Sequence, residues 1–385
     1  MRVSIVTETY PPEINGVALT VHGLAHGLAA RGHAVQVVRP RQPADASDPG
    51  VATLRVRGVA LPRYAGLRFG LPAGGRLRHA WRAARPDAIY VATEGPLGGS
   101  ALRAASRLGI PACTGFHTRF DDYAAHYGAG LLTPLVRAHL RRFHRRAAAT
   151  LVPTRALADE LAALGIGNAR LLHRAVDTAL FHPQRRDAAL RAGWGARDGS
   201  LVVLYVGRIA PEKNLDLAVR AFRTLQARVP DARYVWVGDG PARAALAAAH
   251  PDFIFAGTRH GEDLARHYAS ADLFLFPSLT ETFGNVTLEA MASGLAVVAY
   301  DRGAAREHLA DGISGMRVPA GDARGFVAAA FALGFDAALR EALRRNARSA
   351  VAALTPAAAI AEFESLLAQL VRERDHGHVA FAARV

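Results

Sequence analysis

Short runs of apolar residues alternate with longer amphipathic stretches along this chain. Short apolar runs bounded by turn residues predict buried strands, and apolar residues at helical spacing predict helices. In the first half, the pattern predicts strands at Val3–Thr7, Ala34–Arg39, Ala52–Val56, Ala88–Ala92, Ala112–Phe116, Thr150–Val152 and Arg170–Leu172. It predicts helices between them at Val17–Ala30, Gly98–Leu108, Leu132–Arg146 and Arg155–Leu164.

The same pattern starts again in the second half. It predicts strands at Leu201–Val206, Arg233–Val237, Phe253–Ala256, Leu273–Phe276, Ala296–Ala299 and Met316–Val318. The predicted helices are Leu215–Arg228, Ala242–Ala249, Glu262–Ala269, Asn285–Ala292 and Ala323–Leu333, and two Ala-rich helices near Asp336–Leu354 and Pro356–Arg372 close the chain.

Alternation of strands and helices favours parallel sheets that are covered by helices on both faces. Two such series predict an α/β protein with two doubly wound, Rossmann-like domains. We expect the N-terminal domain at residues 1–180, the second domain at 181–354, and a C-terminal helix and tail at 355–385 that return to the N-terminal domain. Ligands of such sheets bind at the carboxyl ends of the strands, so we expect the site in a central cleft between the domains.

Length and composition exclude several classes of protein. A chain of 385 residues exceeds what one hydrophobic core usually supports, and 51% apolar residues exclude a disordered protein. The single cysteine, Cys113, excludes an internal disulfide and a Cys-rich zinc site, and it suits a reducing cytosol. The chain has no segment that reads as a targeting signal and no run of 18 apolar residues, so we expect no membrane-spanning helix and only peripheral membrane contact.

The positive charge is concentrated in the first half. The net charge is +14, and residues 1–184 hold 23 basic and 11 acidic residues, whereas residues 185–385 hold 24 and 22. A basic half requires an anionic partner, for which nucleic acid, an anionic membrane and an anionic substrate are the candidates. No nucleic-acid-binding module is recognisable, which disfavours the first candidate.

Two segments of the first half, residues 49–86 and 123–158, contain many arginines and no acid. In the predicted helix near 131–146, Leu135 and Val136 would face inward, while Arg137, Arg141 and Arg145 would face outward. One interpretation is a solvated surface. The other is a platform that docks on the anionic inner face of the cell membrane.

The loop after the strand Leu201–Val206 carries two cations. Arg208 and Lys213 lie five residues apart, and Lys213 is the only lysine among 47 basic residues. Two cations at the carboxyl end of a sheet suit a diphosphate. The alternative is ordinary surface charge, with Glu212 as a local partner.

The segment Ser278–Met291 follows the strand Leu273–Phe276 and opens a helix. We expect Asn285 to be the N-cap and the backbone N–H groups near Phe283 and Gly284 to point outward, where they suit a phosphate. The carboxylates of Glu281 and Glu289 accept hydrogen bonds from sugar hydroxyls. The alternative for Glu289 is an acid that is favoured near a helix start by the dipole.

Other candidate sites are weaker. Asn15-Gly16 opens a helix after the first strand, where a glycine lets an anion approach the backbone, and His117 follows the strand Ala112–Phe116. A single histidine at such a position is more often structural. The chain contains no Asp-x-Asp, no His-Glu-x-x-His, no Gly-x-Ser-x-Gly and no dinucleotide fingerprint, which disfavours metal chemistry, a serine hydrolase and a dehydrogenase.

Taken together, these segments resemble GT-B-fold retaining glycosyltransferases of family 4. The opening loop and Phe116-His117-Thr118 are most similar to bacterial GDP-mannose-dependent α-mannosyltransferases and lipid glycosyltransferases. Arg119 and Asp121-Asp122 depart from the family pattern, which bears on the acceptor. The residues that carry the resemblance are Pro11–Val17, Phe116–Thr118, Gly207-Arg208, Glu212–Asn214, Val237–Pro241 and the element from Glu281 to Glu289.

The resemblance implies roles for these residues and a substrate class. The diphosphate of the donor would bind Gly16, Arg208 and Lys213, and His117 would lie beside the transferring sugar. Glu289 would bind the ribose, and Glu281 the hydroxyls of the donor sugar. The donor site would also include Gly238, Thr258, Arg259, Phe283, Gly284, Asn285 and Val286.

The implied activity is transfer of a hexose, with mannose favoured, from a nucleotide sugar to a lipid or lipid-linked acceptor. Neither a bound metal nor another cofactor is implied, and GDP-mannose or a UDP-hexose is the substrate. A UDP-sugar donor with a soluble saccharide acceptor stays open, as does a nucleotide-sugar 2-epimerase of the same architecture.

Overall fold

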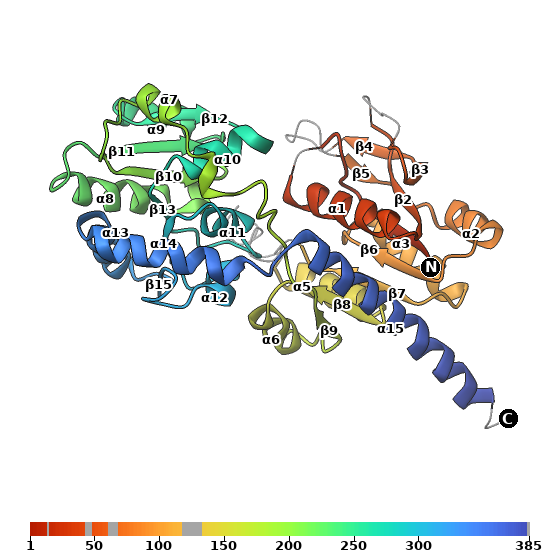
Figure 1. The fold of residues 1–385 in the computed structure, drawn as a ribbon. Coiled ribbons are helices and arrows are strands. Elements are labelled where there is room, and N and C mark those ends of the chain that lie inside the picture. The colour runs from red at the N-terminus through yellow and green to blue at the C-terminus, as the bar shows by residue number, and fades with distance from the viewer. Residues whose placement is uncertain (14, 43–47, 61–67, 118–132, 383–385) are drawn as a thin grey trace. The chain divides into compact units, whose positions relative to one another are not determined.

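The computed structural model describes the chain except for residues 14, 43–47, 61–67, 118–132 and 383–385 (Figure 1). The chain forms two compact units. The first unit comprises Met1–His173 and Pro356–Val385, and the second comprises Arg174–Thr355.

A parallel seven-stranded sheet forms the centre of the first unit, in the order β3-β2-β1-β6-β7-β8-β9. The strand order reverses between β1 and β6. The switch point of the sheet therefore lies at the carboxyl ends of these two strands. The strands are β1 (Arg2–Val6), β2 (Ala34–Pro40), β3 (Ala52–Val56), β6 (Ala88–Val91), β7 (Ala112–Gly115), β8 (Ala149–Val152) and β9 (Ala169–Leu171).

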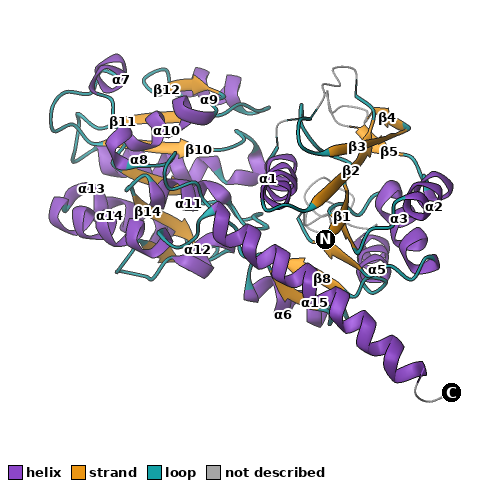
Figure 2. Cartoon of the chain, turned by 45° about the vertical axis from the view of Figure 1, so that its right-hand side comes forward, coloured by secondary structure: helices purple, strands orange, loops and turns teal. Residues whose placement is uncertain are grey.

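Helices cover both faces of this sheet (Figure 2). Alternating strand residues separate the two cores: Val3 and Ile5 belong to one, and Val6 belongs to the other. The first core includes α1 (Gly16–Ala30) and α15 (Pro356–Ala382), whereas the second includes α2 (Gly74–Ala83), α3 (Pro96–Arg107) and α5 (Thr133–His144). The described part of this unit also contains helix α6 (Arg155–Ala163) and a short antiparallel pair, β4 (Gly58–Ala60) and β5 (Arg68–Gly70).

The second unit has a six-stranded parallel sheet in the order β12-β11-β10-β13-β14-β15, with its switch point between β10 and β13. The strands are β10 (Val202–Val206), β11 (Arg233–Val237), β12 (Ile254–Gly257), β13 (Leu273–Phe276), β14 (Ala296–Tyr300) and β15 (Met316–Val318). The helices are α7 (Ala188–Gly193), α8 (Leu215–Gln226), α9 (Arg243–Ala249), α10 (Gly261–Ala269), α11 (Asn285–Ala292), α12 (Gly303–His308), α13 (Ala323–Phe335) and α14 (Ala337–Val351), with short 3-10 helices η2 (Pro183–Arg185) and η3 (Pro211–Lys213).

The predicted fold class is confirmed, because both units are Rossmann-like parallel α/β structures. The strands predicted in both halves are all present, with ends that differ by at most one residue. The sequence pattern did not indicate the helices α2, α7 and α12 or the strand pair β4–β5. Each of these two strands has three residues, which is too short for a periodic pattern.

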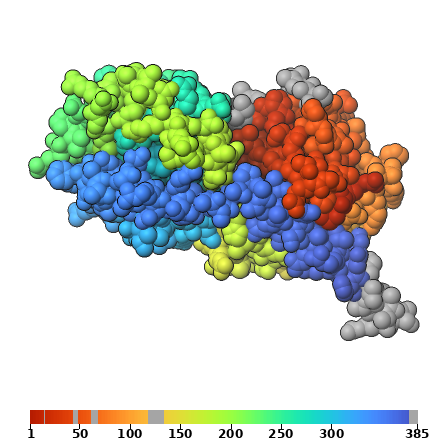
Figure 3. Space-filling model, in the orientation of Figure 1, coloured from red at the N-terminus to blue at the C-terminus, as the bar shows by residue number. Residues whose placement is uncertain are grey.

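One stretch, Ala337–His376, is long and apolar enough to cross a membrane by length and composition. In the structure it is divided between α14 and α15. The apolar side chains Phe363, Leu367 and Leu370 of α15 are buried in the core of the first unit. Figure 3 shows this C-terminal segment in blue lying against the red N-terminal part. Only 17% of the apolar window is buried, so packing on the first unit accounts for part of its apolar character.

Candidate functional site

The loops at the carboxyl ends of β10, β11 and β12 are joined by backbone hydrogen bonds. The Gly207 N–H donates to the Val237 carbonyl at 3.0 Å, and the Gly238 N–H donates to the Gly257 carbonyl at 2.9 Å. The Ile209 N–H donates to the Asp239 carbonyl at 2.9 Å. The neighbouring strands thus hold three predicted donor-binding segments at one edge of the sheet.

Gly238 allows the close approach of these loops. Its φ is +131°, a value that side-chain-bearing residues rarely adopt. A Cβ atom added here would lie 2.0 Å from the Gly207 carbonyl oxygen. The glycine in the Val237–Pro241 motif is therefore required for the backbone contact between the loops.

Lys213 and Glu281 meet across the switch point of the sheet. The Lys213 Nζ lies 2.5 Å from Glu281 Oε1, and the Ser278 hydroxyl donates to the same oxygen at 2.8 Å. Both charged side chains are largely buried, with exposed fractions of 13% and 15%. Asn214, in the left-handed conformation with φ 55°, connects η3 to α8. The structure thus brings together two residues that lie 68 positions apart in the sequence.

Arg208 contacts Glu212, the local acidic partner that we would expect if Arg208 were ordinary surface charge. Its Nη1 atom lies 3.3 Å from Glu212 Oε1, and the buried Tyr205 hydroxyl donates to the Arg208 carbonyl at 3.0 Å. The Arg208 side chain is 42% exposed, whereas that of Glu212 is 6% exposed. The guanidinium therefore remains accessible to an anionic ligand while its loop is anchored.

Helix α11 begins differently from the prediction. Asn285 was expected to be the N-cap, but the N-cap is Gly284, which has φ 85° and no side-chain acceptor, and Asn285 is the first helical residue. The prediction was wrong because the left-handed turn at Gly284 starts the helix without a side-chain cap. The N–H groups in the first turn of α11 are therefore not capped by side chains. An anion site at a helix start requires such uncapped N–H groups.

Glu289 lies one turn inside α11 and is partly buried. The Tyr268 hydroxyl of α10 donates to Glu289 Oε2 at 2.8 Å. Burial raises the pKa of Glu289 to about 7, and the Tyr268 hydrogen bond opposes this shift. A partly buried carboxyl group held by a tyrosine is a suitable acceptor for ligand hydroxyls. Its pKa makes the charge of this site change near neutral pH.

The segment after β12 contains Thr258 and Arg259. Arg259 Nε donates to the Ala256 carbonyl at 2.9 Å, and its Nη1 atom lies 3.1 Å from Asp263 Oδ2. Gly257 turns the chain here with φ 73°. Arg259 is thus fixed to its own turn and to the first turn of α10, at the same sheet edge as the other donor candidates.

Two candidate residues of the first unit, Asn15 and Gly16, lie beside its switch point, in the segment after β1. Asn15 caps α1, because its side chain accepts from the N–H groups of Val17 and Ala18. Gly16 follows, with nothing within 4 Å of a Cβ atom added to it. Earlier in the same segment, buried Glu8 accepts from the N–H of Leu97 in α3 at 3.0 Å, and burial raises the pKa of Glu8 to about 7.

His117 follows β7 and hydrogen-bonds with the Tyr90 hydroxyl at 2.7 Å. Gly115 makes room for this contact, because a Cβ atom there would lie 2.2 Å from the Tyr90 hydroxyl and 2.5 Å from His117 Nε2. The histidine is therefore oriented by a tyrosine of β6. The departures at Arg119 and Asp121-Asp122 lie outside the described residues.

Sequence reasoning missed the residues that orient the candidates. Tyr268 holds Glu289, Ser278 holds Glu281, and Tyr90 holds His117. Only Ser278 lies close to its partner in the sequence, within the motif already identified. No local signal indicates the two tyrosines, because each reaches its partner from another element of the fold.

The exposed face of α5 is strongly basic, and one predicted orientation on it is wrong. Arg137, Arg141 and Arg145 are exposed as expected, and Leu140 and Phe143 pack inward. Leu135, however, is 68% exposed. In the described part of the helix, the inward stripe follows Val136, Leu140 and Phe143, which leaves Leu135 among the arginines. The predicted start at Leu132 lies outside the described residues.

The chain is similar to known glycosyltransferases. Residues 14–180 match the family model described as Glycosyltransferase Family 4, and residues 200–334 match the model described as Glycosyl transferases group 1. A GDP-mannose-dependent alpha-mannosyltransferase of Mycobacterium tuberculosis (strain CDC 1551 / Oshkosh) is 37% identical over 84% of this chain and 85% of its own length. An alpha-monoglucosyldiacylglycerol synthase of Acholeplasma laidlawii is 29% identical over 78% and 81%.

The fold is shared with solved structures. Sucrose-phosphate synthase from Thermosynechococcus elongatus superposes with a TM-score of 0.77, covering 97% of this chain and 99% of its own, at 21% sequence identity. At this identity the likeness concerns the fold alone.

Proposed function

Because the chain belongs to glycosyltransferase family 4 and is a hexosyltransferase, we propose that it transfers mannose from GDP-mannose to a lipid or lipid-linked acceptor with retention of configuration. The observation that carries the donor half of this proposal is the Lys213–Glu281 pair at the switch point between β10 and β13. In the proposed complex, Lys213 would bind a phosphate and Glu281 would bind the donor sugar, next to the start of α11.

The donor diphosphate would lie on Arg208, Lys213 and the first-turn N–H groups of α11. Negative charge develops on this group as the bond to the sugar breaks, and preorganised cations and N–H dipoles stabilise it. Glu281 would accept hydrogen bonds from the sugar hydroxyls, and Glu289 from the ribose. Thr258 and Arg259 would border the base.

The transfer step would follow a front-face route. This route needs no covalent intermediate, whereas a double displacement would need a second carboxylate that attacks the sugar. The departing phosphate oxygen would then take the proton of the acceptor hydroxyl, and no bound metal is required. Gly16 would border the diphosphate from the first unit, and His117, held by Tyr90, would lie beside the transferring sugar.

Two names among the relatives support the choice of substrates. One relative is named for GDP-mannose, and another is named as a synthase of a glucosylated diacylglycerol. The basic face of α5, with exposed Leu135 among its arginines, supports a cytoplasmic enzyme that docks reversibly on an anionic membrane leaflet. Such docking would bring a lipid acceptor to the first unit.

The test is a donor panel on the full-length protein. GDP-mannose, UDP-glucose, UDP-galactose and UDP-glucuronate are each incubated with acceptor lipids without added metal, and nucleotide release and the anomeric configuration of the product are measured by NMR. We expect GDP release from GDP-mannose only, with an α-linked glycolipid. Release of UDP, an inverted product or a metal requirement would contradict the corresponding part of the proposal. Conversion of a UDP-sugar without any acceptor would indicate an epimerase.

The role of His117 has a separate test. His117→Ala should lower kcat far more than it changes the Kd for GDP, because the side chain is proposed to act beside the sugar. Tyr90→Phe removes the orienting hydroxyl and should lower kcat by a smaller factor. An unchanged kcat in His117→Ala would identify the histidine as structural.

A further inference from the structure

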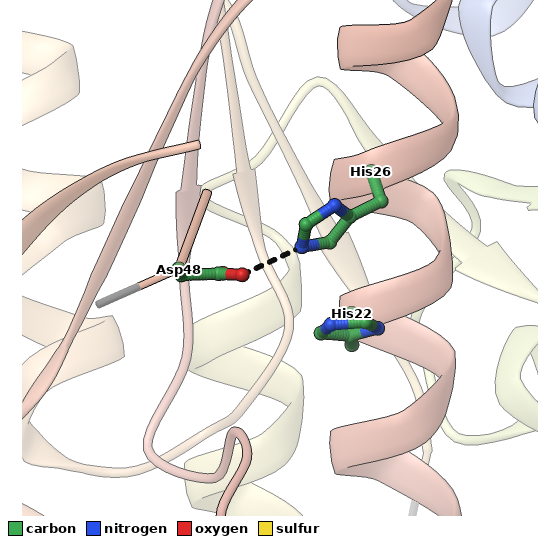
Figure 4. A group of neighbouring side chains, drawn as sticks. All are labelled: His22, His26 and Asp48. Carbon is green, nitrogen blue, oxygen red and sulfur yellow. Dashed lines mark hydrogen bonds and ion pairs between the residues drawn. The ribbon is translucent and has the colours of Figure 1, made fainter. Parts of the chain in front are cut away.

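Three side chains that can bind a metal meet in the first unit, and none of them has a role in the site above. They are His22 and His26 of α1 and Asp48 of the segment before β3 (Figure 4). Each offers one ligand atom, and these atoms all lie within 4.8 Å of one another. We refer to these three residues as the two-histidine cluster.

The two histidines are presented by a rigid helix. They lie four residues apart, so both project from one side of α1, and their ring centroids are 4.2 Å apart. The opposite side of the helix is anchored in the core by Val21, Leu24 and Leu28. The spacing of the imidazoles is therefore set by the helix.

Asp48 is also held in place. It starts a tight turn, Asp48-Pro49-Gly50-Val51, in which the Val51 N–H donates to the Asp48 carbonyl at 3.3 Å. Gly50 has φ 84°, as the third position of a type II turn requires, and Val51 is buried in the core. The Asp48 carboxylate is thus presented to α1 from a fixed turn.

Both carboxylate oxygens of Asp48 are engaged. Oδ1 lies 2.8 Å from His26 Nε2, and Oδ2 accepts from the Tyr10 hydroxyl at 2.6 Å. A hydrogen bond to the far oxygen of a carboxylate is the usual outer contact that orients a metal ligand. Tyr10 belongs to the loop that leads to Asn15 and Gly16, so the two-histidine cluster is connected to that loop.

A simple hydrogen-bonded pair would explain His26 and Asp48, but it does not require His22. The His22 ring lies beside this pair and presents a ligand nitrogen within 4.8 Å of the ligand atoms of His26 and Asp48. Two imidazole nitrogens and one carboxylate oxygen are a donor set that suits zinc and similar ions, whereas magnesium and calcium prefer oxygen alone.

We propose that His22, His26 and Asp48 bind a divalent transition-metal ion, Zn²⁺ in the first place, which ties the Asp48 turn to α1. Ligand atoms around tetrahedral zinc lie about 3.3 Å apart, so small side-chain rotations would bring the cluster to that geometry. The ion would stabilise the first unit. Through Tyr10 it would also steady the loop that precedes Gly16, without taking part in sugar transfer.

The experiment titrates the metal-free, full-length protein with Zn²⁺ by calorimetry and with Co²⁺ by visible absorption. We expect one ion per chain, visible bands of four- or five-coordinate Co²⁺, and a higher melting temperature with metal. His22→Ala and Asp48→Asn should each weaken binding at least tenfold, and Tyr10→Phe about tenfold. His79→Ala removes an exposed histidine of α2 and is the matched control.

Asp48→Asn keeps groups that can hydrogen-bond with His26 and Tyr10, so it separates lost metal binding from lost folding. The metal-free melting temperature of each variant is measured in parallel. The proposal is wrong if the wild-type protein binds Zn²⁺ no more tightly than the His22→Ala and Asp48→Asn variants. It is also wrong if Mg²⁺ at equal concentration displaces Zn²⁺.

Discussion

At the scale of single residues, Lys213 has two possible partners, the Glu281 carboxylate that it contacts in the structure and the donor diphosphate that we propose. Lys213→Ala should weaken donor binding at least tenfold, because charge-assisted bonds to a phosphate contribute roughly 1.5–3 kcal/mol. The Kd for GDP and for GDP-mannose is measured by calorimetry. Arg228→Ala, an exposed arginine after α8, is the control, and equal Kd values in the two variants would exclude the phosphate role.

Substitutions of Glu281 and Glu289 should have different effects on sugar transfer and on nucleotide binding. Glu289→Gln should weaken binding of GDP itself, because the ribose loses its anionic acceptor. Glu281→Gln should leave GDP binding nearly unchanged and lower the rate of mannose transfer. Calorimetry with GDP and turnover with GDP-mannose test both variants, and the reverse pattern would mean that the two roles are exchanged.

Glu289 also makes stability depend on pH. The unfolded carboxyl group binds its proton only below about pH 4.5, whereas the folded one retains it up to about 7. The folded state therefore binds more protons in this window, and the free energy of unfolding falls as pH rises through it. Glu289→Gln should raise the free energy of unfolding at pH 8 by about 1–2 kcal/mol, less than the full pKa shift because the side chain is partly exposed.

Urea denaturation at pH 4.5 and pH 8 measures this effect. At pH 4.5 the wild-type protein and the Gln variant should have similar stability, because protonated Glu289 is also neutral. A difference between them that is independent of pH would show that Glu289 is ionised throughout the range.

At the scale of elements, the loops after β10 and β11 depend on a glycine. Gly238→Ala adds a Cβ atom 2.0 Å from the Gly207 carbonyl, so the loop that holds Arg208 must move. We expect a loss of about 2 kcal/mol or more of stability, together with weaker donor binding. Gly312→Ala is the control for strain alone, since Gly312 has φ 69° and open space around its Cβ position. Equal effects of the two substitutions on GDP binding would contradict this account.

At the scale of the whole molecule, the C-terminal helix completes the core of the first unit. Phe363 is fully buried, and its ring centroid is 5.1 Å from that of Tyr90, the residue that holds His117. Phe363→Ala should lower stability by about 3–5 kcal/mol. Differential scanning calorimetry, with the exposed Ser365→Ala as control, checks this loss. A melting temperature within about 2 °C of the wild-type value would mean that the α15 contact contributes little.

Membrane docking is also a property of the whole molecule, because α2 and α5 belong to one core and lie on one face of their sheet. We expect co-sedimentation with phosphatidylglycerol vesicles at low salt and release at roughly 0.5 M salt, since screening removes the attraction. Arg142→Glu with Arg145→Glu should abolish sedimentation, whereas Arg220→Glu with Arg228→Glu in the second unit should not. Binding that ignores lipid charge would favour a soluble acceptor.

The sequence alone predicted the two parallel α/β series and the loops that carry Arg208, Lys213 and the two acids of the Glu281–Glu289 element. These features are local: a strand is indicated by its apolar run, and a loop residue by its place after that run. Tertiary structure decided which residues meet. The Lys213–Glu281 pair, the two orienting tyrosines and the Asp48 contact with α1 each join segments that are distant in sequence. Periodicity contains no information on such contacts, because strand order and helix packing determine them only in the folded chain.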